Sequence, residues 1–304
     1  MDFFSKNDWS TFLHSDISVN YPIIFLHGIV GSNRDWEKTA QTLVGDDYYK
    51  IHYTNQDFQL STLNLPIEIS YQNEPVDILD DQFRRKTKEQ TKASVWLISY
   101  YTSNLTSEIW NGDLTLYAHR ISNIIECIKV LTGKDKVILV GHSMGGLIAR
   151  KFMTLHEKYR SSVHKILTVA SPHEGVQAPL AILGHFIDLQ NGSDFFRKLN
   201  RVWNYDRADN RLKWGVTGAI NPKAISNFLR RMKNKTDSGG MGFVTLSSVF
   251  PFGEWEESIQ YPDQEKLATK NFSYRLFTYA HHEDLLYHRS SFQGIRWALL
   301  DIKK

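Results

Sequence analysis

The feature that most constrains the fold of this chain is a short glycine-rich stretch, VGHSMGG, at residues 140–146. It follows DKVILVG (135–141), an apolar run typical of a buried strand, and it leads into MGGLIARKFMTLH, which has helical spacing. The stretch fits Gly-x-Ser-x-Gly, in which a serine stands on a sharp turn between a strand and a helix with its hydroxyl exposed. Glycines are needed there because a Cβ would collide with the turn or the neighbouring strand. Ser143 is therefore predicted to be a nucleophile, and the helix N-terminus behind it favours developing negative charge.

Strands and helices alternate along the chain. Apolar runs enriched in branched residues predict buried strands at 21–29, 93–101, 135–141 and 164–172. Amphipathic stretches predict helices at 32–43, where Ser32 or Asn33 caps the first turn, at 116–133, where Gly133 ends the helix, and at 144–156. Two later strands are expected at 242–250 and 272–279. This alternation predicts an α/β fold with a mostly parallel sheet and helices on both faces.

The chain is expected to form a single domain over residues 1–304, with two segments that interrupt the alternation. Residues 45–92 are polar and rich in tyrosine, with a weak strand pair at most, so they are interpreted as an insertion of unclear structure. Residues 176–241 contain several aromatic side chains and a basic run, FLRRMKNK, and are predicted to form a helical lid or cap above the carboxyl ends of the strands.

These motifs resemble those of α/β-hydrolases of the lipase and esterase type. PIIFLHGIVGSNRDW is similar to the His-Gly oxyanion segment of bacterial lipases, and TGKDKVILVGHSMGGLIARKF and TVASPHEG resemble that family and the GPI inositol-deacylase-like hydrolases. The resemblance covers roughly residues 20–44, 93–175 and 242–300. In this fold one oxyanion donor is the N–H of the residue after the nucleophile, here Met144. The resemblance to lipases implies that the second donor is the N–H of Ile29.

The catalytic base is expected late in the chain, because the order in this fold is Ser, acid, His. The stretch AHHEDLLYH (280–288) follows a predicted strand and precedes apolar residues at helical spacing. Its spacing does not match a zinc motif such as H-E-x-x-H, so we favour one working imidazole over a metal site. A His followed two residues later by Leu-Leu resembles the catalytic His of small bacterial lipases, which favours His282 over His281.

The sequence defines the acid of the triad less sharply. The acid should follow the strand predicted at 242–250, and Glu254 comes first after it, next to Gly253. Glutamate is an accepted substitute for aspartate in this role. The alternatives left open are Glu256, Glu257, Asp263 and Glu174. His142 and Cys127 are interpreted as packing residues rather than as catalytic groups.

The combined features predict a serine carboxylic-ester hydrolase, a lipase or esterase, that acts through an acyl-enzyme on Ser143 with His282 and Glu254. Two alternatives remain open: another acyl-transfer enzyme on this scaffold (amidase, thioesterase or acyltransferase), or a catalytically inactive hydrolase-fold binding protein. Neither a metal nor an organic cofactor is expected. The expected substrate is a small-molecule or lipid ester, and the basic lid predicts peripheral contact with lipid surfaces.

Composition excludes some other classes. The net charge of +3, without a Lys/Arg stripe, argues against a nucleic-acid partner. Cys127 is the single cysteine, so no intramolecular disulfide can form. The first residues do not resemble a signal peptide, and no apolar run reaches the length of a membrane span, so a cytoplasmic protein is expected.

Overall fold

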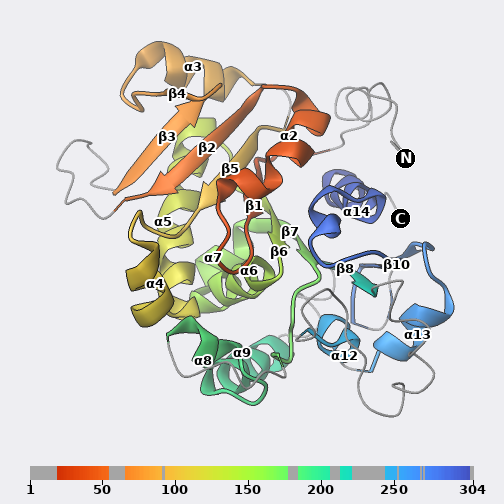
Figure 1. Ribbon diagram of the computed structural model, residues 1–304. Coiled ribbons are helices and arrows are strands. Elements are labelled where there is room, and N and C mark those ends of the chain that lie inside the picture. Colours follow the sequence, from red (N-terminus) through yellow and green to blue (C-terminus); the bar gives the residue numbers. More distant parts are fainter. Residues whose placement is uncertain are drawn as a thin grey trace.

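The computed structural model describes residues 19–54, 66–90, 93–176, 184–205, 213–220, 244–251, 253–267, 269 and 271–301. Their strands form one ten-stranded sheet in the order β4-β3-β2-β5-β1-β6-β7-β8-β10-β9 (Figure 1). Neighbours run parallel through the series β2 (Tyr48–Tyr53), β5 (Val95–Ser99), β1 (Ile23–Leu26), β6 (Val137–His142), β7 (Val163–Val169), β8 (Trp214–Ile220) and β10 (Tyr274–Tyr279). Antiparallel strands lie at the two ends, namely β3 (Ile67–Tyr71), β4 (Glu74–Pro75) and β9 (Lys266–Leu267). The predicted mostly parallel sheet is confirmed.

Helices cover both faces of the sheet. One face packs against η1 (Asn33–Trp36), α2 (Glu37–Val44), η4 (Asp284–Tyr287) and α14 (Arg289–Leu299). The other packs against α3 (Asp81–Glu89), α5 (Leu114–Thr132) and α6 (Met144–Leu155), and α7 (Glu157–Ser161) contacts α6. The predicted caps are confirmed, because Ser32 forms a capping box at η1 and Gly133 ends α5 in the left-handed conformation. No helix of the described residues is both long enough and apolar enough to cross a membrane.

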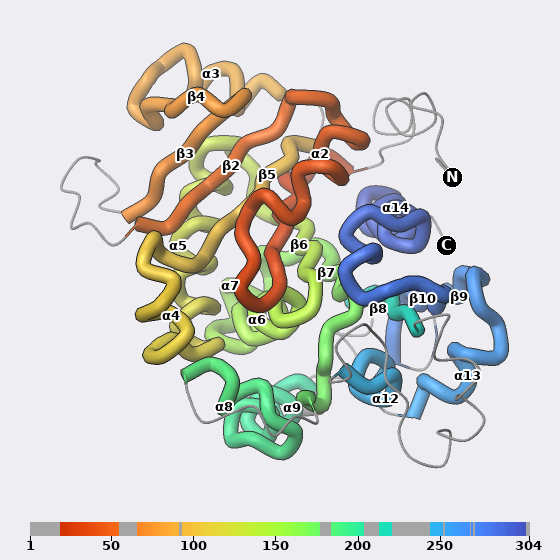
Figure 2. Tube along the Cα trace, viewed as in Figure 1, coloured from red at the N-terminus to blue at the C-terminus, as the bar shows by residue number. Residues whose placement is uncertain are grey.

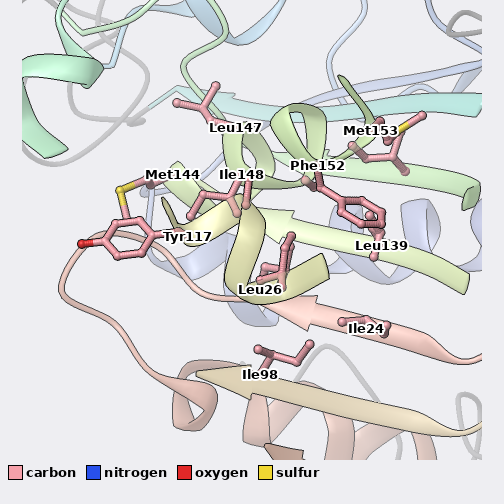
Figure 3. Close-up of a cluster of buried hydrophobic side chains, with 14 of the residues drawn as sticks. Ile24, Leu26, Ile98, Tyr117, Leu139, Met144, Leu147, Ile148, Phe152 and Met153 are labelled. Carbon is pink, nitrogen blue, oxygen red and sulfur yellow. The ribbon is translucent and has the colours of Figure 1, made fainter. Parts of the chain in front are cut away.

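The strand β1, IIFL, is apolar on every residue because both of its faces are buried. In β1, Ile24 and Leu26 pack in the cluster with α5 and α6, whereas Ile23 and Phe25 pack in the cluster with α2 and α14. Figure 3 shows the first cluster, with Ile148 and Phe152 of α6 beside the strands. Alternate side chains of one strand thus enter two separate cores, which explains why the sequence shows a continuous apolar run instead of an alternating pattern.

Shorter helices complete the described chain. They are α4 (Leu105–Asn111), α8 (His185–Leu189), α9 (Asp194–Tyr205), α12 (Leu246–Val249) and α13 (Trp255–Gln260). α8 contacts α4 and α9, and α9 contacts α6, the helix that begins after Ser143. Figure 2 shows α4, α8 and α9 together at the lower side of the molecule. The helices α8 and α9 belong to the segment for which the sequence predicted a helical cap.

A strand runs through that same segment. Trp214–Ile220 form β8, which lies between β7 and β10 in the parallel series. The prediction of a strand at 242–250 is wrong for the described residues of that range, 244–250, because they contain the helix α12, capped by the Thr245 side chain. Residues 45–92, predicted to hold a weak strand pair at most, contain β2 and β3, an antiparallel pair that extends the sheet, together with α3. The predicted strand at 272–279 is confirmed as β10.

Candidate active site

Ser143 stands on the turn between β6 and α6 with a backbone conformation that non-glycine residues rarely adopt. Its φ is 53° and its ψ is −122°. The turn is held by hydrogen bonds: the Ser143 N–H donates to the Val169 carbonyl at 2.8 Å, and the Gly146 N–H donates to the Ser143 carbonyl at 3.2 Å. A strained residue persists only where its surroundings enforce it, and such residues cluster at functional sites. The geometry is that of the nucleophile turn expected from VGHSMGG.

The glycine after the nucleophile turn brings α6 against the loop that follows β1. A Cβ at Gly145 would lie 2.4 Å from the carbonyl oxygen of His27, a backbone atom that cannot move aside cheaply. Gly28 in that loop also lies close to Ser143, because a Cβ on Gly28 would lie 3.3 Å from the Cβ of Ser143. The His-Gly loop therefore touches the nucleophile turn directly.

Tyrosines of β5's carboxyl end hold the His-Gly loop. The Tyr100 hydroxyl donates to the His27 carbonyl at 2.8 Å, and the Val30 N–H donates to the Tyr101 hydroxyl at 3.4 Å. Ile29, one predicted oxyanion donor, lies in this loop between the two contacts. Met144, the other, is the first residue of α6, and its N–H has no carbonyl partner within the helix. The arrangement brings both predicted donors close to Ser143, and their role as an oxyanion hole remains a prediction.

His282 lies in the turn between β10 and η4, beside the nucleophile turn. The His142 ring donates from Nε2 to the His282 carbonyl at 3.0 Å, and the two ring centroids are 4.7 Å apart. Burial lowers the pKa of His282 to about 4, so the imidazole is neutral at neutral pH, as a general base must be. Among the described residues, its buried Nδ1 has no hydrogen-bond partner. His281 is exposed, and its N–H donates to Asp284.

The other polar groups of the 280–288 stretch have structural roles. His288 caps α14, because its Nδ1 accepts from the Ser290 N–H at 3.2 Å. Asp284 lies in the first turn of η4. Within the described ranges, no three His, Cys, Asp or Glu side chains are grouped so that they could hold a metal ion.

Glu254, predicted as the triad acid, is almost fully buried at the N-terminus of α13 and bound to other groups. Its Oε1 accepts from the Asn271 N–H at 2.7 Å, and its Oε2 accepts from Thr269 Oγ1 at 2.7 Å and Arg275 Nη1 at 2.9 Å. Glu254 does not bond to His282, whose Nδ1 has no partner in the part of the chain that the structure describes. These contacts favour a structural carboxylate, although the role of Glu254 in catalysis stays a prediction.

The alternative acids do not bond to His282 Nδ1 either. Glu257 pairs with Lys266 at 2.7 Å and with Arg275 at 3.2 Å, and the hydrogen bond from Lys266 lowers its pKa. Asp263 accepts from the Thr278 hydroxyl. Glu256 is exposed on α13, and the Glu174 N–H donates to Ser248 Oγ at 2.9 Å.

The sequence did not predict that His142 links the Ser143 turn to the loop of His282. It treated His142 as a packing residue, and the ring is indeed only 4% exposed. Its position directly before the nucleophile was the available signal, but the bond to His282 depends on a loop 140 residues away in sequence.

The sheet order, the strained serine turn and the His-Gly loop define an α/β-hydrolase of the lipase and esterase type. Two solved structures share the fold: the gene lin2722 product from Listeria innocua (TM-score 0.56, 13% identity, 94% of this chain and 96% of that chain) and the mature lipase BlEst2 from Bacillus licheniformis (TM-score 0.52, 16% identity, 95% and 96%). Residues 19–234 match the model of the PGAP1-like alpha/beta domain, so the chain belongs to that family.

Curated relatives match over shorter stretches. A GPI inositol-deacylase from Eremothecium gossypii is 40% identical over 120 residues, which cover 38% of this chain and 11% of the relative. Another from Kluyveromyces lactis is 32% identical over 117 residues, which cover 38% of this chain and 12% of the relative. The match thus spans about an eighth of those longer proteins.

Proposed function

We propose that the chain is a serine hydrolase that cleaves carboxylic esters through an acyl-enzyme on Ser143. The observation that carries the proposal is the strained Ser143 turn, with the His282 loop bonded to the residue beside it at 3.0 Å. His282 takes the proton from the Ser143 hydroxyl as that oxygen attacks the acyl carbonyl, and it then donates the proton to the leaving alcohol. Water hydrolyses the acyl-enzyme by the same steps. The N–H groups of Ile29 and Met144 stabilise the oxyanion, each by a factor on the order of 10²–10³ in rate.

Asp237 is our candidate for the triad acid, ahead of Glu254. The acid lies between Ser and His in chain order, and catalytic groups follow the carboxyl ends of parallel strands. β8 ends beside the His282 loop, because the Ala280 N–H donates to the Ile220 carbonyl at 3.1 Å. The sequence that follows β8, residues 221–243, lies outside the described residues and contains a single acidic residue, Asp237. The sequence and the end of β8 therefore support Asp237.

The proposed substrate is an acyl ester on a lipid, including an acylated inositol. This choice rests on the relatives described as GPI inositol-deacylases and on the family of residues 19–234. The test is a panel of p-nitrophenyl esters with short, medium and long acyl chains, run beside phospholipids and a lipid-linked acyl-inositol. Release of fatty acid from the acyl-inositol by the wild type and not by Ser143→Ala supports the proposal. Cleavage of amides or thioesters in preference to every ester would contradict it.

We also propose that α8 and α9 contact lipid surfaces. Apolar side chains are exposed on both helices, Ile187 at 50% and Val202 at 42%, and α9 adds exposed basic side chains at Arg197, Lys198 and Arg201. Each basic residue near an anionic surface adds about 1 kcal/mol of binding. Vesicles with anionic lipids should bind the protein with an affinity that falls as salt is raised. Equal retention by neutral and anionic vesicles would contradict this electrostatic contact.

A further inference from the structure

His142 contacts all three loops that form the candidate site. Its backbone belongs to the nucleophile turn, its Nε2 lies 3.0 Å from the carbonyl oxygen of His282, and a Cβ on Gly28 would lie 3.2 Å from its Nδ1. The Trp36 ring meets it edge-on with centroids 6.3 Å apart. One buried side chain thus fills the space where the nucleophile turn, the His-Gly loop and the His282 loop meet.

The hydrogen bond to His282 has only one possible direction. A carbonyl oxygen only accepts, so Nε2 of His142 carries the proton. Burial lowers the pKa of His142 to about 3, so the ring is neutral at neutral pH and its single proton is on Nε2. Protonation changes in the working range of an esterase therefore do not break this bond.

The His282 loop has few other attachments near the site. The Ala280 N–H donates to Ile220 and the His281 N–H donates to Asp284, a residue of the same loop. In the described part of the chain, the bond from His142 is the one that joins the His282 backbone to the nucleophile turn. The ring contact, with centroids 4.7 Å apart, packs the two imidazoles against each other. A displacement of about 1 Å in a reacting group can lower a rate by a factor on the order of 10².

We infer that His142 is a positioning residue, which holds the His282 backbone so that its imidazole reaches Ser143. The inference rests on the proposed function, because it concerns the base of that reaction. It assigns to the residue before the nucleophile a role beyond packing. The role requires a hydrogen-bond donor at the place of Nε2, and not merely a side chain of similar volume.

Two amide substitutions separate the donor from the volume. In His142→Gln the side-chain NH₂ reaches about as far as Nε2, whereas in His142→Asn it reaches only as far as Nδ1, short of the His282 carbonyl. We expect His142→Asn to lose roughly tenfold or more in kcat with KM unchanged. We expect His142→Gln to retain kcat to within about threefold of the wild type. The measurements are kcat and KM on a p-nitrophenyl ester and the rate of labelling by a fluorophosphonate, with circular dichroism and Tm for each variant.

His142→Phe and His164→Phe complete the set. His142→Phe keeps an aromatic ring but has no donor, so it should lose kcat like His142→Asn. His164 lies at the start of β7, at the amino end of the parallel strands, where its Nε2 is 3.0 Å from Asp301, so His164→Phe should keep the wild-type kcat. Should His142→Phe fail to fold, the Gln and Asn pair still decides the question.

Equal kcat for His142→Gln and His142→Asn would overturn the positioning role, as would a loss that appears in KM rather than kcat. Each comparison is made against active wild-type protein. If the His142 variants keep the wild-type kcat, this inference is overturned and the proposed hydrolase function still stands. If the wild-type protein does not hydrolyse esters, both are overturned.

Discussion

Replacing Glu254 by glutamine should destabilise the protein without removing its chemistry. The Glu254 carboxylate is 6% exposed and accepts three hydrogen bonds, from Thr269, Asn271 and Arg275. The Arg275 side chain is 2% exposed, so the pair is buried on both sides. Glutamine has nearly the same shape as glutamate but no charge. Its NH₂ group would face hydrogen-bond donors at a position where a carboxylate oxygen of Glu254 accepts.

The expected loss follows from this burial. Breaking a buried ion pair by neutralising one partner costs about 3–5 kcal/mol of unfolding free energy. Two contacts reduce that cost here: Glu257 still pairs with Arg275 at 3.2 Å, and the remaining amide oxygen of glutamine still accepts. We therefore expect Glu254→Gln to lose about 2–4 kcal/mol.

The assay compares stability with turnover. Urea unfolding followed by circular dichroism gives the unfolding free energy, and kcat on a p-nitrophenyl ester is measured where each variant is fully folded. Glu254→Gln should keep kcat within about threefold, since its carboxylate does not contact His282, whereas a triad carboxylate-to-amide change costs a factor on the order of 10⁴. Asp237→Asn is expected to show that loss in kcat. Glu256→Gln, an exposed neighbour on α13, is the matched control and should change neither quantity.

The reasoning would be refuted by the reverse pattern. If Glu254→Gln lowers kcat by a factor on the order of 10³ or more at wild-type stability, Glu254 is the triad acid after all. The contacts with Thr269, Asn271 and Arg275 would then have to break during catalysis. If Asp237→Asn keeps the wild-type kcat, Asp237 is not the triad acid.

Three further outcomes are expected. His282→Ala should lower kcat on the order of 10⁴-fold or more, whereas His281→Ala should lower kcat less than about threefold. EDTA should change neither kcat nor Tm. If His281→Ala loses more kcat than His282→Ala, the catalytic base is His281. Burial lowers the pKa values of His27 and His142 to about 3 and the pKa of His282 to about 4, so the unfolded chain binds more protons than the folded chain below the ordinary value of 6.5. The midpoint of urea unfolding should therefore fall as the pH drops from neutral towards about pH 4. A midpoint that does not change with pH would contradict the buried, neutral state of these histidines. Gly145→Ala should prevent formation of the nucleophile turn, since its Cβ would lie 2.4 Å from the His27 carbonyl; wild-type kcat and Tm would contradict that contact.

The sequence predicted the elements whose patterns are set locally. The buried strand that leads into VGHSMGG begins as a continuous apolar run, VILV, and the Ser32 and Gly133 caps are single-residue signals that the structure reproduces. The positive φ of Ser143 follows from the same short motif. Local chemistry was enough to predict the strained turn at Ser143 and the strand before it.

The sequence did not reveal β8, because tertiary packing shaped its composition. Its residues, WGVTGAI, include two glycines, which weaken a strand prediction. A Cβ at Gly215 would lie 2.4 Å from the Trp297 ring, and one at Gly218 would lie 2.5 Å from Phe250. The glycines are there to admit aromatic side chains from distant segments, a reason that no local window contains.

Tertiary packing also affected the strand on which the prediction of the acid was based. GFVTLSSVF carries the β-branched residues of a strand, but Thr245 caps a short helix through the Ser248 N–H, and tertiary contacts outweigh the local preference. Taking this stretch for the strand before the acid directed attention to Glu254, whereas the parallel strand beside β10 is β8. The wrong strand therefore removes the reason for which Glu254 was preferred, while its role in catalysis stays a prediction.

Labelling with a fluorophosphonate, followed by mapping of the modified peptide, tests the central claim most directly. The reagent reacts only with an activated serine, so the wild type should carry the label on Ser143, in the peptide that contains GHSMGG. Ser143→Ala should take up no label, keep the wild-type Tm and lose activity by a factor on the order of 10⁴–10⁶. A wild-type protein that hydrolyses esters but carries the label elsewhere, or a Ser143→Ala variant that keeps more than about a tenth of the activity, would contradict the assignment of Ser143 as the nucleophile.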